Sequence, residues 1–366
     1  MCIDIKCQPG LPSPPSPTSR NNSEELGVVV SVYLLRRLIY MVFVLLGVSV
    51  IIFLLVRVLP GDPIRYILGP MATEDDVQHL RHELGLDQPL HVQYATFLKG
   101  IFLERKMGMS LLERRDVTDV IREKAPATIE LALMAMLLAM AMGVPLGILS
   151  GIHKEGTWDK AGRIIALSGV SFPEFWIGIM LQMAFGYMLG LLPLTGRVTG
   201  APPDHVTGMY VLDSILTGNA RALQDSLKHI ILPAVVLSLS PLANITRVLR
   251  ARVIDETHKD YVLVNRASGM PESIVVGKYI LKNAFASTLT MIGLSAGLML
   301  GGAFVVEKVF AWPGMARYGA DAVLNKDFNG IVGVTIVVCL GFVVINFVID
   351  VLYGILDPRM RVCDHE

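Results

Sequence analysis

Apolar residues in this chain gather into six stretches, and the segments between them hold nearly all of the charged residues. Each stretch has about the 20 residues that a helix needs to cross a hydrocarbon core. The predicted spans are residues 38–56, 131–152, 164–194, 230–246, 284–306 and 330–349. The pattern therefore predicts an all-α integral membrane protein with six transmembrane helices.

The third stretch is the least regular of the six. It holds Glu174, the one ionisable residue inside any stretch, directly after Pro173, where a break or kink is expected. The stretch could be one bent span or an interfacial turn followed by a span, and six spans are preferred to seven. Glu174 could line a solute path, pair with a polar group, or mark the interfacial turn.

Basic residues in the short loops set the orientation, because cytoplasmic loops are enriched in Lys and Arg. With six spans, the short segments richest in Lys and Arg all fall on one side of the membrane. They precede the first span, follow the second and the sixth, and fill the loop 247–283. The sequence therefore predicts a multi-pass membrane protein with both termini in the cytoplasm.

The segments outside the spans divide the chain further. Residues 1–27 are rich in Pro, Ser and Asn and are expected to be disordered, either as a regulatory extension or because of a start codon assigned too early. A helix start at residues 73–76, a stop at Gly85 and a second start at Asp87 and Pro89 predict a helical extracytoplasmic region. The predicted regions are 1–27 (tail), 28–59 (first transmembrane helix), 60–128 (extracytoplasmic), 129–354 (transmembrane core) and 355–366 (cytoplasmic tail).

Composition supports a membrane protein and excludes several other classes. Hydrophobic residues make up 53% of the chain, charged residues 17%, and the mean hydropathy is +0.56. The 32 basic residues equal the 32 acidic ones, so no overall field indicates a nucleic-acid partner. The four cysteines form no disulfide framework, no metal-binding cluster is present, and no catalytic motif appears.

The loop 247–283 predicts a helix, a hinge and a second helix. A short helix runs to about Ser268, Gly269 suits the left-handed residue that ends it, and Pro271 suits the start of the next. Tyr261 and Val264, followed by Ala267 or Ser268, recur at helical spacing and give an apolar face. That face could enter a partner groove or lie in the lipid interface. A nucleotide site is not predicted, because Glu272 and Tyr279 break the phosphate-binding pattern around Lys278.

Two further features concern helix packing and the path of a solute. Gly293, Gly297 and Gly301 repeat every four residues, which predicts a face for close helix packing. Trp312 follows the fifth span, where an aromatic side chain is more often an interface anchor than a contact to a ligand. Candidates for the pathway or gate are Glu174, Trp176 and Trp312.

Seven separate segments, in order, resemble one family. They are LLRRLIYMVFVLLGVSVIIFLLVRVLPGDP, LGLDQPLHVQY, PATIELAL, SFPEFWIGIML, DYVLVNRASGMPE, VVEKVFAWPGMARYGADAVLNKDF and LDPRMR, within about residues 33–361. The chain resembles inner-membrane permeases of binding-protein-dependent ABC importers, specifically the dipeptide, oligopeptide and nickel permeases. The resemblance implies the type I importer fold, with an extracytoplasmic helical insertion between helices 1 and 2.

The resemblance also implies a role for the short cytoplasmic helix. In the family this coupling helix docks on the ATP-hydrolysing subunit. The positions that would dock here are Asp260, Tyr261, Val264, Arg266, Ala267 and Gly269. The residues 263–265 are Leu, Val and Asn where the wider family has Glu, Ala and Ala, so the details of this chain's docking are individual.

The implied partners are a second homologous permease subunit, two ATP-binding subunits that hold ATP and Mg, an extracytoplasmic solute-binding protein, and membrane lipid. This chain itself would bind no cofactor and catalyse no reaction. The alternative function is a secondary transporter or channel that works alone, but such carriers keep several ionisable groups in their spans. The solute is not fixed by the resemblance: a dipeptide, an oligopeptide, a nickel chelate or another small molecule all suit this family.

Overall fold

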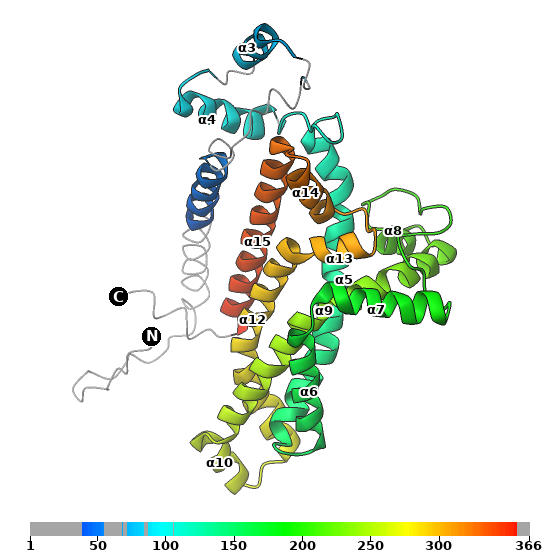
Figure 1. Cartoon of the computed structure of the whole chain (residues 1–366). Coiled ribbons are helices and arrows are strands. Elements are labelled where there is room, and N and C mark those ends of the chain that lie inside the picture. Colours follow the sequence, from blue (N-terminus) through cyan, green and yellow to red (C-terminus); the bar gives the residue numbers. More distant parts are fainter. Residues whose placement is uncertain (1–38, 55–67, 69–71, 84–86, 105, 357–366) are drawn as a thin grey trace, which may run out of the picture.

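A computed structural model describes residues 39–54, 68, 72–83, 87–104 and 106–356. Within these ranges the chain is helical, and the one extended pairing is an isolated bridge between Met109 and Asp116. Figure 1 shows long helices side by side, with α10 at one end of the molecule and α3 and α4 at the other. The all-α fold class predicted from the sequence is confirmed.

The described elements follow one another along the chain. They are the apolar helix Ile39–Leu54, α3 (Glu74–Glu83), α4 (Leu90–Lys99), η1 (Gly100–Glu104), α5 (Val117–Ile152), α6 (Thr157–Ser171), α7 (Glu174–Leu181), η2 (Gln182–Met188), α8 (Tyr210–Leu216), α9 (Ala220–Thr257), α10 (Asp260–Ala267), α11 (Glu272–Ile274), η3 (Val275–Ile280), α12 (Leu281–Gly302), α13 (Phe304–Val309), α14 (Met315–Leu324) and α15 (Phe328–Leu356). The η elements are π-helical segments.

Four helical segments of the described chain are long and apolar enough to cross a membrane. They are Val117–Ile152, Ala220–Thr257, Glu272–Gly302 and Phe328–Leu352. They contain three of the predicted spans in full and most of the span 284–306, and a shorter apolar helix lies within the predicted first span. The chain is therefore a multi-pass membrane protein by helix length and composition, while the count of six spans stays a prediction.

The third predicted span is broken into separate helices. α6 ends at Ser171, Phe172 and Pro173 are extended, and α7 begins at Glu174. The break predicted at Pro173 is confirmed, and its cause is that proline has no N–H to donate to the preceding turn. Figure 1 shows α7 turned sharply away from the axis of α6, so residues 164–194 do not form one continuous helix.

α5 and α9 pack along each other and build the centre of the molecule. Gly147 and Gly151 of α5 permit this approach, because a Cβ atom at Gly147 would lie 3.0 Å from the Cβ of Leu249, and one at Gly151 only 2.6 Å from that of Val253. These glycines follow the small-residue spacing of closely packed membrane helices. They were not predicted, although their four-residue spacing matches that of the run at 293–301.

The region 60–128 contains helices, as its capping residues predict. α3 begins after Thr73, whose hydroxyl accepts a hydrogen bond from Asp76 N while the Asp76 carboxylate accepts one from Thr73 N. α4 begins after Pro89. The position of this region relative to the membrane stays a prediction. The tail 1–27, the stop at Gly85 and the residues from 357 onward lie outside the described ranges.

Candidate functional site

The end of α10 has the geometry predicted for a helix stop. Gly269 has φ of +74°, in the left-handed region that favours glycine. Gly269 N donates to Arg266 O at 3.0 Å, and Met270 N donates to Asn265 O at 3.2 Å. These two bonds are the Schellman pattern, which satisfies the last carbonyl groups of a helix. Pro271 is the residue just before α11 rather than its first, a one-residue difference from the prediction.

α10 has a buried face and an exposed face. Val262 is buried against Val275 and Ile280, so this side holds the helix on the body of the protein. Leu263 and Val264 are 56% and 63% exposed on the other side. These two large apolar side chains form a surface patch on α10 that no other described residue covers.

Tyr261 does not belong to that exposed surface. Its hydroxyl donates to the Glu256 carboxylate near the end of α9 and accepts from Asn283 Nδ2, at the start of α12, at 3.0 Å. The sequence grouped Tyr261 with Val264 on one apolar face. The structure instead has Leu263 beside Val264, because residues 260–267 present positions 260, 263, 264 and 267 on the same side.

An ion pair closes the hinge after α10. Arg266 donates to both carboxylate oxygens of Glu272, at 2.5 and 3.1 Å. Both side chains are partly exposed, so solvent screens the pair and it adds little to stability. Its geometric effect is to hold the first turn of α11 against the last turn of α10.

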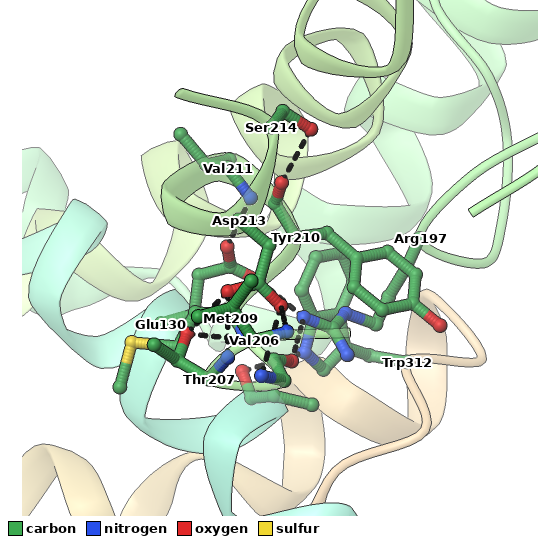
Figure 2. A network of polar contacts seen from close by, with 12 residues as sticks. Glu130, Arg197, Val206, Thr207, Met209, Tyr210, Val211, Asp213, Ser214 and Trp312 are labelled. Atoms are coloured by element: carbon green, nitrogen blue, oxygen red, sulfur yellow. Dashed lines mark hydrogen bonds and ion pairs between the residues drawn. The ribbon is translucent and has the colours of Figure 1, made fainter. Parts of the chain in front are cut away.

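A buried ion pair joins the N-terminal half of α5 to the loop before α8. Arg197 Nη2 lies 2.5 Å from Glu130 Oε2 and 3.0 Å from Gly208 O, and both charged side chains are buried. The second carboxylate oxygen of Glu130 accepts from Val211 N at 2.6 Å. Figure 2 shows this network joining α5 to the loop before α8. The prediction of site residues missed this pair, although Glu130 directly precedes an apolar run and Arg197 is the one arginine between η2 and α8.

Trp312 is part of the same network. The indole is 1% exposed, Nε1 donates to Ala127 O at 2.9 Å, and the Arg197 guanidinium lies 5.5 Å from the ring centroid. Tyr210 covers the guanidinium from another direction, at 3.7 Å. An interface anchor needs an exposed ring, so that alternative for Trp312 is wrong.

Glu307, after α12, is a second buried carboxylate. Its oxygens accept from Thr128 Oγ1 at 2.5 Å and from Arg317 N at 2.6 Å. Gly314 permits this packing, because a Cβ atom there would lie 2.1 Å from Glu307 Oε1. Burial disfavours the charged form and raises the pKa of Glu307 to about 7.

The other two pathway candidates lie on α7. Glu174 is in its first turn and has no hydrogen-bond or ion-pair partner among the described residues. Trp176 is partly exposed and stacks on Phe172, with ring centroids 5.4 Å apart. Phe175, between them, lines an apolar pocket of about 790 Å³ that α12, α13, α14 and α15 also border.

The predicted glycine run lies against α15. A Cβ atom at Gly293 would be 2.5 Å from Ile349 Cγ1, and one at Gly297 would be 2.3 Å from Phe342 Cδ2. Gly301 is less crowded, with Val338 Cγ1 at 3.9 Å. The first two glycines thus allow contact between α12 and α15, and the third is not required for it.

The described residues include no group of three or more His, Cys, Asp or Glu side chains that could hold a metal ion. Among the cysteines, the structure describes Cys339, which is a free thiol in α15.

Comparison with known proteins identifies the family. Residues 143–362 match the model of the binding-protein-dependent transport system inner membrane component, and residues 30–132 match the model of the N-terminal part of such membrane components. The chain belongs to this family. It is a permease of the ABC transporters, a transport protein rather than an enzyme, and the family implies ATPase and solute-binding partners.

Several curated relatives cover nearly the whole length of the permease. The chain is 39% identical to the probable D,D-dipeptide transport system permease protein DdpB of Escherichia coli, over 87% of this chain and 94% of the relative. It is 37% identical to the dipeptide transport system permease protein DppB of Alkalihalophilus pseudofirmus, over 90% and 99%. It is 36% identical to the glutathione transport system permease protein GsiC of Salmonella choleraesuis, over 90% and 98%.

Proposed function

We propose that this permease forms half of the translocation pathway for a peptide or a similar small solute. A second, homologous permease subunit forms the other half, and an extracytoplasmic binding protein delivers the solute. Two ATP-binding subunits hold ATP and Mg and drive the cycle. The relatives named for dipeptide and glutathione transport support a peptide-like solute.

The exposed pair Leu263 and Val264 on α10 carries this proposal. α10 stands at the end of the long helix α9, and its inner face is held by Val262 and by the Tyr261 hydroxyl. A force applied to the exposed face therefore reaches α9 and α12 directly. The surface formed by Leu263, Val264 and Ala267, with Asp260 and Arg266 at its margins, is the part that docks on the ATPase.

The orientation follows from this docking. The ATPases act from the cytoplasm, so α10 and both chain termini face the cytoplasm of a cell (inner) membrane. The region 60–128 is then extracytoplasmic and forms the insertion between the first and second of six transmembrane helices. The core 129–354 carries the pathway, and its loop 247–283 carries the coupling helix.

The pathway itself runs along α7 and past the turn after α13. Glu174 supports this proposal because it is an ionisable group in an apolar segment and has no partner among the described residues. Trp176 and Trp312 are the other two pathway or gate residues. If Glu174→Gln transports a panel of solutes as well as the unchanged permease, Glu174 has no role in the pathway.

Docking is tested by replacing Leu263 with Glu in the permease co-expressed with its ATPase subunits. The expected result is at least tenfold less ATPase co-purified with the permease, because a buried apolar anchor at an interface is worth 1.4 kcal/mol or more when lost. Leu216→Glu is the matched control, since Leu216 is similarly exposed on α8, away from α10. Equal co-purification of the two variants would contradict docking through α10.

The transport class is tested by uptake into proteoliposomes. Uptake of a labelled dipeptide should require the ATPase subunits, ATP and the binding protein. Uptake driven by a proton gradient through this chain alone would support the secondary-transporter alternative instead.

A further inference from the structure

A pocket rich in arginine lies between α6 and α9, apart from the coupling helix and the outer network. Its volume is about 340 Å³. The described lining includes three arginines and no acidic residue: Arg163, Arg247 and Arg250. The N-terminal end of α6 lies toward α10 in Figure 1, so the arginines lie in the half of the molecule nearer to the coupling helix.

The described residues balance only part of the positive charge of this pocket. Asp159 is fully buried, and its oxygens lie 2.5 and 3.0 Å from Nε and Nη2 of Arg250. The same carboxylate lies 3.3 Å from Arg163. One negative charge is thus shared by two guanidinium groups.

Arg247 has no carboxylate partner in the described part of the chain. Its Nη2 donates to Asn244 Oδ1 at 3.0 Å, and its other N–H groups remain available. Three positive charges around one carboxylate leave an excess of two, which suits an anion with one or two charges.

The polarity of the pocket changes along its length. The chain directions of α6 and α9 put Arg163 and Arg250 toward α10, and the uncharged lining residues farther from it: Ala166, Ser171, Ala243 and Asn244. Each step of three or seven residues along a helix is about 5 to 10 Å. The charged end and the uncharged end are therefore separated by about the distance from a phospholipid phosphate to the start of its acyl chains.

The outer face of α6 is suited to lipid as well. Trp158 and Ile164 are 52% and 64% exposed, and Arg163 stands beside Ile164 in the sequence. Trp is enriched at the boundary between membrane and water, and arginine pockets between membrane helices bind anionic headgroups. The pocket wall at Gly162 is tightly packed, because a Cβ atom there would lie 2.4 Å from Ser150 Oγ.

We propose that this pocket binds the phosphate headgroup of an anionic phospholipid, with Arg247 and Arg163 as the headgroup ligands. The lipid belongs to the leaflet on the α10 side, which is the cytoplasmic leaflet if the proposed orientation holds. Arg250 and Asp159 form the rigid wall of the site, and the acyl chains lie along Ala166 and the outer face of α6.

The test measures lipid retention by the permease complex. The full chain, co-expressed with its partner subunits, is placed in nanodiscs of phosphatidylcholine and phosphatidylglycerol in equal amounts, and native mass spectrometry counts the lipids that stay bound. The unchanged protein should retain phosphatidylglycerol in preference to phosphatidylcholine. Arg247→Gln and Arg163→Gln should each weaken that preference about fivefold, the effect of one basic residue near an anionic surface.

Arg252→Gln is the matched control. Arg252 is exposed on the same helix, five residues after Arg247, and does not line the pocket. It should leave retention unchanged. Equal losses for Arg252→Gln and Arg247→Gln, or no preference for phosphatidylglycerol in the unchanged protein, would overturn the proposal.

A second arm separates the lipid from free anions. In nanodiscs of phosphatidylcholine alone, inorganic phosphate should not raise the melting temperature of the complex. Adding phosphatidylglycerol to the nanodiscs should raise it, and this increase should require Arg247. If inorganic phosphate gives the same Arg247-dependent increase, the pocket is a site for soluble anions and the lipid assignment is wrong. Neither arm depends on solute uptake, so failure here leaves the transport proposal intact.

Discussion

Arg197 and Glu130 form a buried ion pair that joins two segments 67 residues apart in the sequence. The guanidinium lies over the Tyr210 ring and near Trp312, while Glu130 also accepts from the backbone of Val211. The pair thus connects α5, the loop before α8 and the turn after α13, as Figure 2 shows for these side chains. Because both side chains are buried, each charge needs the other to offset the free-energy cost of removing it from water.

Removing one member of this pair should destabilise the protein strongly. Arg197→Met leaves the Glu130 carboxylate buried and uncompensated, which costs about 3 to 5 kcal/mol and should lower the melting temperature in detergent. The double variant with Glu130→Gln should recover part of the loss, because no buried charge remains. Arg221→Gln, an exposed arginine in the first turn of α9, is the control and should melt like the unchanged protein. Additive losses in the double variant would show that the two side chains are not coupled.

Gly269→Val should reduce both transport and the ATP hydrolysis that accompanies it. Valine at a φ of +74° is strained by about 1 to 2 kcal/mol, so α10 would end in a different geometry and present its exposed face wrongly. Transport and solute-stimulated ATPase activity in proteoliposomes should both fall, while membrane insertion is unchanged. Gly277→Val is the control, since Gly277 has no positive φ and open space around its Cβ position. Normal coupling in Gly269→Val would remove the mechanical role of this turn.

Tyr261→Phe should raise the number of ATP molecules hydrolysed per solute transported. The ring keeps its packing, but the hydroxyl no longer links α10 to Glu256 near the end of α9 and Asn283 of α12. Each lost hydrogen bond is worth about 1 kcal/mol, which is enough to loosen α10 without unfolding it. The measurement is the ratio of ATP hydrolysis to dipeptide uptake. Tyr279→Phe should leave the ratio unchanged, and an unchanged ratio in Tyr261→Phe would contradict a positioning role.

Stability should depend on pH through Glu307. Burial raises the pKa of this carboxyl to about 7 in the folded protein, above its ordinary value of 4.5. The folded state therefore holds the proton more tightly than the unfolded state between these two values. Stability should be highest below pH 4.5 as far as this group decides it, and should fall by roughly 3 kcal/mol as the pH rises to and beyond 7.

The measurement is the melting temperature of the permease in detergent between pH 5 and pH 8, for the unchanged protein and Glu307→Gln. The variant should lose most of the decline over this range, because a neutral amide does not titrate. A decline of the same size in both proteins would assign the pH dependence to other groups.

Local residue choices predicted several elements correctly. Pro173 broke the third apolar stretch, Gly269 ended α10 in the left-handed conformation, and Thr73 with Asp76 capped α3. In each case the cause acts within one helical turn. The opposite holds for Tyr261, which was placed on the exposed face by its spacing from Val264 but bonds to residues at both ends of the loop.

The sequence by itself determined the class of the protein: its apolar stretches required membrane helices, and its seven matching segments indicated the permease family. Gly269 and Pro271 also located the end of the short helix α10. Only the tertiary structure decided which polar groups are paired. Glu130 with Arg197, and Asp159 with Arg250, come from distant segments, and a charge reveals no partner until the helices pack. Hydrophobic length is a property of one segment and can be read along the chain, whereas burial and charge pairing depend on neighbours that only the fold supplies.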